Sequence, residues 1–297
     1  MEKLQLFLNQ EAFNVWYFRG PEKAPIIHWA HATGFNGPTY SMLLNELSNT
    51  FHVYAWDARL HGHTQGLSQP KSKNFIQTYC DDLVNLIEVI YQKHNNKVIL
   101  AGHSFGAALC IKAEQRLKNK ISTLILADPV LFTPFLSLMS RLGRLIKLRK
   151  PKNMYLAQNA ARRRNHWRSF DEIYVNYKKK VLFKKWPDEA LKNYIKYGTK
   201  SSNSGVYLAC PPEVESQIFL ECENEFLFDS ISKLNTPTTL VIADNGSPAF
   251  GLNAFKNSKA KIKTVKLSNE THFFPVENHK ILTREVSKIF FSDQNVK

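Results

Sequence analysis

The sequence contains no apolar run that approaches the roughly 18 residues needed to span a membrane. Residues 1–20, MEKLQLFLNQEAFNVWYFRG, alternate like a strand and lack the unbroken apolar stretch of a signal peptide. The four cysteines form no CxxC pair, and without an export signal we expect reduced thiols at Cys80, Cys110, Cys210 and Cys222. These absences predict a cytoplasmic protein, and its 297 residues suffice for one large domain or one domain with an insertion.

Signatures of phosphate and metal binding are also missing. No glycine-rich phosphate loop occurs anywhere in the sequence. His61 and His63, in the segment HGHT, are spaced like a metal-ligand pair. However, Gln65 and Gly66 stand where metallohydrolases of this pattern place a further Asp and His. We therefore expect no metal site, and no motif implies a cofactor.

Acidic residues are scarce in one part of the chain. The whole sequence has 40 Lys and Arg against 25 Asp and Glu, a formal charge of +15. Residues 132–205 hold 18 of the basic residues and four of the acids, so this segment alone carries +14. Such a surface is either a solvated face or a site for an anionic partner. Residues 135–150, FLSLMSRLGRLIKLRK, have the form of a basic amphipathic helix that could rest at the periphery of an acidic membrane, whereas no reader motif supports nucleic acid.

Strand and helix patterns alternate along most of the sequence. Apolar or alternating runs predict strands at 4–9, 13–20, 25–34, 51–60, 97–103, 121–130, 236–245 and 260–269. Helical periodicity or composition predicts helices at 38–49, 75–94, 105–120, 249–257 and 281–291. This order is typical of an α/β fold with a mostly parallel sheet covered by helices on both faces. The alternation breaks at residues 132–235, where helices with charged faces predict a helical cap inserted into a core made of residues 1–131 and 236–297.

The segment GHSFG, residues 102–106, lies between the predicted strand VILA and a predicted helix. A tight strand-to-helix turn exposes a serine hydroxyl and places the next backbone N–H beside the reacting carbonyl. Such a turn needs small neighbours because the backbone folds back on itself, and Gly102 and Gly106 supply them. Ser104 is therefore the candidate nucleophile; the alternative is a glycine-bounded turn with an uninvolved serine.

Two further segments complete this chemistry. HATGFNG, residues 31–37, follows a predicted strand and suits the second oxyanion donor, so the candidate donors are the backbone N–H groups of Thr33 and Phe105. Among ten histidines, only His272 lies in the loop between the last predicted strand and the last predicted helix. It follows the serine by a long interval, which makes it the candidate general base.

Five motifs together resemble those of the α/β-hydrolases. DARLHGHT, residues 57–64, is similar to the D-x-R-x-x-G-x-S/T stretch of that superfamily, with His61 where glycine is usual. Together with it, HATGF, GHSFG, LADPV and THFFPVE occur in the family's order from about residue 25 onward. The segments ARRRNHW and FKKWPDEALKNYIKYG also resemble a bacterial subgroup of serine hydrolases. The resemblance implies an eight-stranded α/β-hydrolase fold with a cap and a Ser-His-acid triad.

The acid of the implied triad is not at the sequence position that is usual in that superfamily. Most members carry it in a V-I-x-G-x-x-D segment, but here VIADNGS places Asp244 at the glycine and Ser247 at the acid position. Some α/β-hydrolases use an acid at the end of the strand after the nucleophile helix, where this sequence has Asp128. We favour Asp128, with Asp244 as the alternative, because the position of the acid in space matters more than its position in sequence.

These observations predict a serine hydrolase that cleaves a carboxylic ester or a thioester through an acyl-enzyme. A perhydrolase or a lyase could use the same serine. The alternative outside enzymes is a non-catalytic or membrane-associated binding protein on a hydrolase scaffold. The expected partner is a small acyl substrate. An anionic group on that substrate would suit it to the basic cap. Candidate pocket residues are His31, Phe35, His103, Phe132, Phe135, Met139, Trp167 and Phe273.

Overall fold

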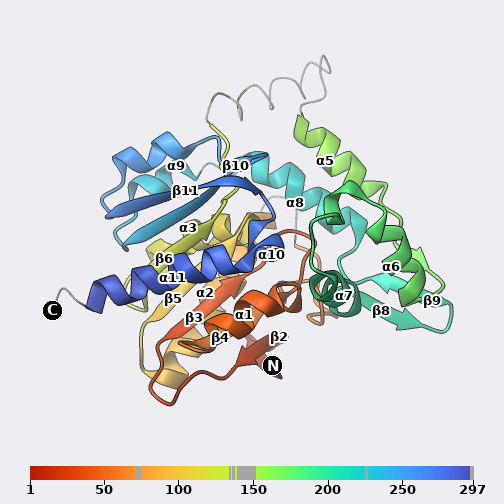
Figure 1. The fold of residues 1–297 in the computed structure, drawn as a ribbon, viewed down its shortest axis with the longest axis horizontal. Helices are drawn as coiled ribbons and strands as arrows, with labels where there is room; N and C mark the ends of the chain where they lie inside the picture. Colours follow the sequence, from red (N-terminus) through yellow and green to blue (C-terminus); the bar gives the residue numbers. More distant parts are fainter. Residues whose placement is uncertain (71–74, 134, 136–137, 139–151, 225–226, 295–297) are drawn as a thin grey trace.

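One eight-stranded sheet organises the chain in the computed structural model (Figure 1). The structure describes residues 1–70, 75–133, 135, 138, 152–224 and 227–294. The strand order is β1-β2-β4-β3-β5-β6-β10-β11; β2 pairs antiparallel with β1 and β4, and the remaining neighbours are parallel. The strands are β1 (Glu2–Leu8), β2 (Glu11–Phe18), β3 (Ile26–Ala30), β4 (His52–Trp56), β5 (Val98–His103), β6 (Ile121–Ala127), β10 (Thr238–Asn245) and β11 (Ile262–Thr271). The predicted mostly parallel sheet is confirmed.

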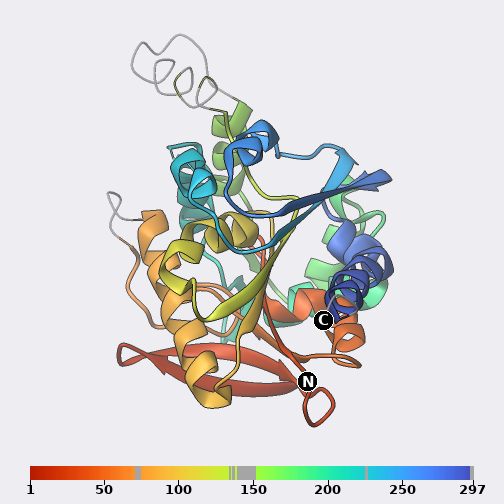
Figure 2. The ribbon, with the colours of Figure 1, turned by 90° about the vertical axis from the view of Figure 1, so that its left-hand side faces the viewer.

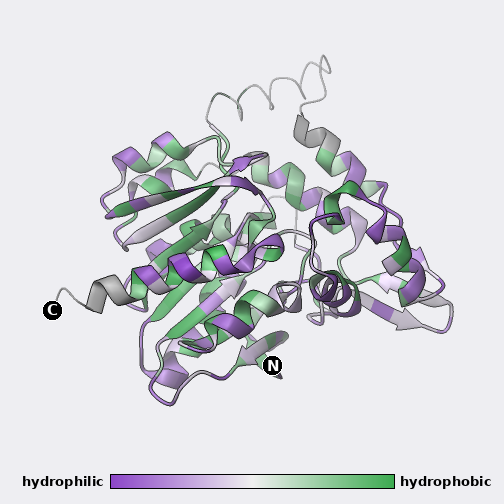
Figure 3. Cartoon of the chain, viewed as in Figure 1, coloured by the Kyte–Doolittle hydropathy of each residue, from purple (hydrophilic) through white to green (hydrophobic). Residues whose placement is uncertain are grey.

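The central strands are buried on both faces, whereas the edges are not. Every residue of β3 and β5 is buried, and their sequences IIHWA and VILAGH are almost entirely apolar. The edge strand β1 instead alternates between exposed and partly buried residues over much of its length. Hydropathy therefore separates the middle of the sheet from its edges, as the colouring in Figure 3 also shows.

Helices cover both faces of the sheet and divide the core into two clusters (Figure 2). α2 and α3 pack together on one face, and α1 and α11 pack together on the other. The described helices outside the segment between β6 and β10 are η1 (Gly37–Tyr40), α1 (Ser41–Leu47), α2 (Phe75–His94), α3 (Phe105–Leu117), η4 (Leu252–Asn257), α10 (Phe274–Glu277) and α11 (His279–Gln294). In the described ranges, no helix combines the length and the apolar character needed to cross a bilayer.

The segment between β6 and β10 holds helices and a second small sheet. Its elements are α5 (Lys152–Ala161), β7 (His166–Trp167), α6 (Phe170–Lys178), η3 (Val181–Phe183), α7 (Asp188–Tyr197), β8 (Thr199–Ser202), β9 (Gly205–Leu208), α8 (Pro212–Asn224) and α9 (Phe228–Ser232). The antiparallel sheet β7-β9-β8 was not predicted, because its strands have only two to four residues and TKSS carries no apolar pattern. Most of the amphipathic helix predicted at 135–150 lies outside the described residues.

This inserted segment meets the loop that follows β3. The side chain of Asn36 in that loop donates to the carbonyl of Tyr194 in α7, at 3.2 Å. From α8, the carboxylate of Glu215 lies against Gly34 of the same loop. Since active sites of open α/β sheets form at the carboxyl ends of the strands, this seam borders the region where a site is expected.

Candidate active site

Ser104 occupies a sharp turn between the end of β5 and the start of α3. Its backbone has φ 56° and ψ −116°, which non-glycine residues rarely adopt and which costs roughly 1–3 kcal/mol. The Ser104 N–H donates to the carbonyl of Ala127 at 3.0 Å, and the Val130 N–H donates to the carbonyl of Ser104 at 3.4 Å. β6 and the residues after it therefore hold the strained turn in place.

The two glycines of GHSFG are required by close backbone contacts. A Cβ on Gly106 would lie 2.2 Å from the carbonyl oxygen of Ala30 in β3. A Cβ on Gly102 would lie 2.7 Å from the carbonyl carbon of Gly106. Both distances are far shorter than a carbon atom tolerates, so α3 can approach β3 and β5 this closely only without side chains at these positions.

A hydrogen-bond relay joins Ser104, His272 and Asp128. His272 lies in the turn between β11 and α10, and its Nε2 is 3.0 Å from Ser104 Oγ. Its Nδ1 is 2.7 Å from Oδ2 of Asp128, which follows β6 and is fully buried. With its hydrogen on Nδ1 directed at the carboxylate, the imidazole presents an unprotonated Nε2 to the serine hydroxyl.

The structure places Asp128, rather than Asp244, beside His272. Asp244 is exposed and accepts a hydrogen bond from the N–H of Asn269 at 2.8 Å. The second oxygen of Asp128 accepts from the Ala243 N–H at 3.2 Å and from the Ser247 hydroxyl at 2.6 Å. Ser247, which stands at the acid position of the α/β-hydrolase pattern, thus holds the carboxylate that comes from the neighbouring strand.

The predicted oxyanion donors come from two segments, the start of α3 and the turn after β3. Phe105 is the first residue of α3, where a helix leaves backbone N–H groups without an intrahelical acceptor. Thr33 lies in the turn after β3, and no acceptor for its N–H occurs in the described part of the chain. Both amides thus remain candidates for the oxyanion hole.

The loop around Thr33 is held by buried polar side chains. The Gly34 N–H donates to His61 Nε2 at 3.1 Å, and the Gly37 N–H donates to Asp57 Oδ1 at 2.8 Å. His31, a predicted pocket residue, accepts from the N–H of Ala58 through Nε2, and its Nδ1 pairs with the carbonyl of Ala32. Burial lowers the pKa of His31 to about 3. Burial also raises the pKa of Asp57 to about 6, although four hydrogen-bond donors oppose that effect.

The histidines of HGHT have structural partners. His61 Nδ1 pairs with the carbonyl of Arg59 at 2.9 Å while its Nε2 serves Gly34. The ring of His63 packs against Trp16, with centroids 5.3 Å apart. Across the described ranges, no three His, Cys, Asp or Glu side chains are grouped as a metal site would require.

Three aromatic rings gather beside the base. Phe273 is 5.2 Å from His272 and 6.2 Å from Phe35, measured between ring centroids. Trp186, from the inserted segment, lies 5.4 Å from Phe35 and 6.2 Å from Phe273. Its buried indole N–H has no acceptor within the described residues. Sequence reasoning missed Trp186, whose only signal is an apolar residue at the end of the lysine-rich stretch KKKVLFKKW.

The remaining predicted pocket residues have different surroundings. Trp167 is buried within the inserted segment, where its ring packs against Tyr177. Phe132 packs beside Phe250, and the side chain of Phe135 is exposed. Met139 lies outside the described residues. His103, another predicted pocket residue, is fully buried, and both of its ring nitrogens are bonded inside the protein.

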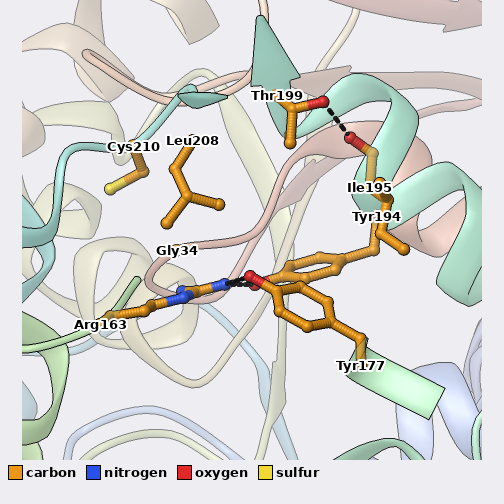
Figure 4. Close-up of a pocket in the computed structure, with 9 residues that line it drawn as sticks. Gly34, Arg163, Tyr177, Tyr194, Ile195, Thr199, Leu208 and Cys210 are labelled. Atoms are coloured by element: carbon orange, nitrogen blue, oxygen red, sulfur yellow. Dashed lines mark hydrogen bonds between the residues drawn. The ribbon is translucent and has the colours of Figure 1, made fainter. Parts of the chain in front are cut away.

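A partly buried arginine links elements of the inserted segment next to the loop that carries Thr33. Arg163 donates to the hydroxyls of Tyr177 at 3.0 Å and Tyr194 at 2.6 Å, as Figure 4 shows. It also pairs with Glu215 at 2.7 Å. A Cβ on Gly34 would lie 2.6 Å from that carboxylate, so the cluster packs directly against the loop. Arg163 lies in ARRRNHW, but a contact 52 residues along the chain could not be inferred from that motif.

Comparisons with known proteins find hydrolases among the similar sequences. The sequence profile described as serine aminopeptidase, S33 matches residues 22–183. A Mycoplasma pneumoniae protein designated esterase/lipase 2 is 28% identical over 155 residues, which cover 51% of this chain and 54% of that protein. The 2-(acetamidomethylene)succinate hydrolase of Mesorhizobium japonicum is 28% identical over 112 residues, covering 38% and 37%. The chain thus spans about half or less of the length of these relatives.

Solved structures match nearly the whole chain, at identities that support the fold alone. The crystal structure of E-2-(acetamidomethylene)succinate hydrolase has a TM-score of 0.77 at 16% identity and covers 97% of this chain and 98% of that one. A thioesterase domain from the curacin biosynthetic pathway has a TM-score of 0.73 at 18% identity, with 96% and 99% covered. Because the family profile covers more than half of the sequence, the chain belongs to the serine aminopeptidase S33 family of α/β-hydrolases.

Proposed function

We propose that the protein is a serine hydrolase that cleaves a carboxylic ester or a thioester. The relay from Ser104 through His272 to Asp128, at 3.0 Å and 2.7 Å, is the observation that carries the proposal. A serine hydroxyl becomes an effective nucleophile only when a base removes its proton. One sequence relative is named as an esterase or lipase, and a thioesterase domain has a similar fold. The family's description as a serine aminopeptidase makes a peptide bond the main alternative for the same chemistry.

Each group has one task in the proposed reaction. His272 Nε2 takes the hydroxyl proton as Ser104 Oγ attacks the acyl carbonyl, and Asp128 stabilises the imidazolium. The N–H groups of Thr33 and Phe105 hold the oxyanion, which is typically worth about 3 kcal/mol per donor. His272 then gives the proton to the departing alcohol or thiol. A water molecule attacks the acyl-enzyme with the same base and releases the acid.

The substrate pocket is proposed to lie at the seam beside His272. Phe35, Phe273 and Trp186 form an aromatic surface suited to an apolar acyl or leaving group. The indole N–H of Trp186, which has no acceptor among the described residues, gives that surface one polar donor. Residues 132–235, proposed as the cap, would therefore set substrate choice while the core supplies the reacting groups.

Labelling by a fluorophosphonate probe tests the nucleophile directly. We expect the native protein to label at Ser104, and Ser104→Ala and His272→Ala to lose labelling while remaining folded. Nitrophenyl esters and acyl thioesters of increasing chain length, together with aminoacyl nitroanilides, then distinguish the substrate classes. A folded native protein that fails to label would favour the alternative of a binding protein on a hydrolase scaffold. Labelling without hydrolysis of any acyl substrate would favour a perhydrolase or a lyase.

An anionic membrane surface is a second candidate partner, and one loop favours it. Residues 178–186, KKKVLFKKW, contain five lysines and no acid. Val181 is 79% exposed at its tip, whereas Phe183 and Trp186 of the same loop are buried inward. Exposed apolar side chains within a basic cluster suit acidic headgroups, where each lysine contributes about 1 kcal/mol.

Vesicle sedimentation tests this partner. We expect the protein to bind vesicles that contain phosphatidylglycerol, and binding to fall with salt and in Val181→Asp. Val175→Asp is the matched control, since Val175 is 52% exposed on α6 outside the lysine cluster. Equal behaviour of the two variants, or equal binding to neutral vesicles, would leave the loop as an ordinary solvated surface.

A further inference from the structure

A buried tyrosine and a buried histidine connect the three segments that carry the proposed catalytic groups. The hydroxyl of Tyr40, in η1, is 2.8 Å from Nδ1 of His103. The same hydroxyl accepts from the Ala32 N–H at 3.1 Å. At the other side of the ring, His103 Nε2 lies 2.8 Å from the backbone carbonyl of His272. These contacts form one continuous chain of hydrogen bonds.

The direction of every bond in this chain is fixed. A carbonyl oxygen only accepts, so Nε2 of His103 carries the hydrogen toward His272. Burial, with His272 close by, holds the pKa of His103 well below its usual range, so its other nitrogen is unprotonated and accepts. The Tyr40 O–H must then donate to that nitrogen, which leaves the phenol oxygen to accept from Ala32. Each donor has one acceptor, and no second arrangement of hydrogens satisfies all three contacts.

The chain ends at residues next to the reacting groups. Ala32 precedes Thr33, His103 precedes Ser104, and the third contact is on His272 itself. Both connecting side chains are almost fully buried, so water does not replace a bond that is lost.

We propose that Tyr40 and His103 are positioning residues that hold the oxyanion loop, the nucleophile turn and the base loop in register. The proposal rests on the serine hydrolase function, in which the base must stay within hydrogen-bond reach of the serine. Without the Tyr40 hydroxyl, His103 Nδ1 loses its donor and the Ala32 N–H loses its acceptor, so the ring is held only by its bond to the carbonyl of His272. The base loop then shifts relative to Ser104.

Two conservative variants test this role. Tyr40→Phe is expected to lower kcat and the rate of fluorophosphonate labelling by about ten-fold, with little change in KM, as expected for one buried hydrogen bond. His103→Gln keeps an acceptor and a donor on one side chain, so it is expected to retain more activity than His103→Leu. The double variant Tyr40→Phe/His103→Leu should be no slower than His103→Leu alone, because both changes break one chain.

A second tyrosine–histidine pair provides the control. The Tyr54 hydroxyl lies 2.8 Å from Nε2 of His94, between β4 and α2. Tyr54→Phe removes the same kind of bond and is expected to lower the melting temperature without slowing labelling. If Tyr40→Phe and Tyr54→Phe lose stability alike and neither slows labelling, Tyr40 has a structural role only and the proposal is overturned.

A readout independent of activity separates this inference from the proposed function. In protein labelled with ¹⁵N-histidine, we expect the His103 resonances at pH 7 to report hydrogen on Nε2 alone, and to change in Tyr40→Phe. His103 found with hydrogen on Nδ1, or charged, would overturn the proposed chain even in a fully active enzyme. A native protein that never labels but shows the expected tautomer would instead remove the serine hydrolase function and keep the connection.

Discussion

Replacing Asp128 by Asn tests the charge in the relay with almost no change in shape. The carboxylate is fully buried and accepts from His272 Nδ1 at 2.7 Å, so the amide removes the charge that would face the imidazolium. Leaving a buried charge without its partner costs about 3–5 kcal/mol. If that cost falls on the transition state, kcat falls by roughly 10²- to 10⁴-fold. Asp244→Asn is the matched control and should change kcat less than two-fold, because Asp244 is exposed and bonds elsewhere.

Ser247 allows the reverse experiment. Ser247→Ala removes one of two donors to the distal oxygen of Asp128 and should lower kcat by about five-fold. In Asp128→Asn/Ser247→Asp, a carboxylate returns at the position used by most α/β-hydrolases, and we expect at least ten-fold recovery over Asp128→Asn. Steady-state ester hydrolysis and labelling rates measure both effects, with thermal melting as the check on folding. An Asp128→Asn variant that retains a third of native kcat while Asp244→Asn fails would refute the assignment of the acid.

Three further changes probe the surroundings of the site. Gly106→Ala should destabilise the fold by at least about 3 kcal/mol in chemical denaturation, since its Cβ would meet a backbone oxygen at 2.2 Å; native-like stability would contradict that contact. Burial lowers the pKa of His28 and His31 to about 3, so the unfolded chain gains protons first as the pH falls below 6.5. The contribution of these histidines to the free energy of unfolding is then fully present above pH 6.5 and falls by roughly 1 kcal/mol per histidine at pH 5.5. A melting temperature that stays constant between pH 8 and 5 would exclude this linkage. Arg163→Met should cost about 3 kcal/mol by leaving a buried carboxylate unpaired, whereas Arg164→Met, which breaks an exposed pair, should cost less than about 1 kcal/mol in the same melts.

Local pattern was sufficient for the core of the fold. The apolar period of residues 75–94 predicted the bounds of α2, because one face of that helix is buried from Phe75 to Ile90. The strand-glycine-serine-glycine-helix order located the turn at Ser104, since only that order brings α3 so close to β3. These features depend on residues adjacent in sequence, so they can be predicted from periodicity and composition.

Contacts made by the inserted segment could not be predicted from local sequence patterns. Trp186 reaches Phe35 and Phe273 from far along the chain, and Arg163 meets Glu215 52 residues away. Each of these partners is one of many similar residues, and only the folded arrangement selects it. The short strands of the second sheet could not be predicted either, because they are defined by their pairing and not by their composition.

The position of the acid shows why sequence order could not decide between the candidates. β6 and β10 are parallel neighbours, so residues after each strand meet at the same edge of the sheet, beside His272. Either strand can therefore supply a carboxylate to one point in space, and the chemistry constrains that point rather than the strand it comes from. In this chain Asp128 supplies the carboxylate, and Ser247 from the other strand supplies a hydroxyl 2.6 Å from it. A serine at the usual acid position is thus consistent with an intact relay rather than a lost one, which is the reason to expect turnover instead of a scaffold that only binds.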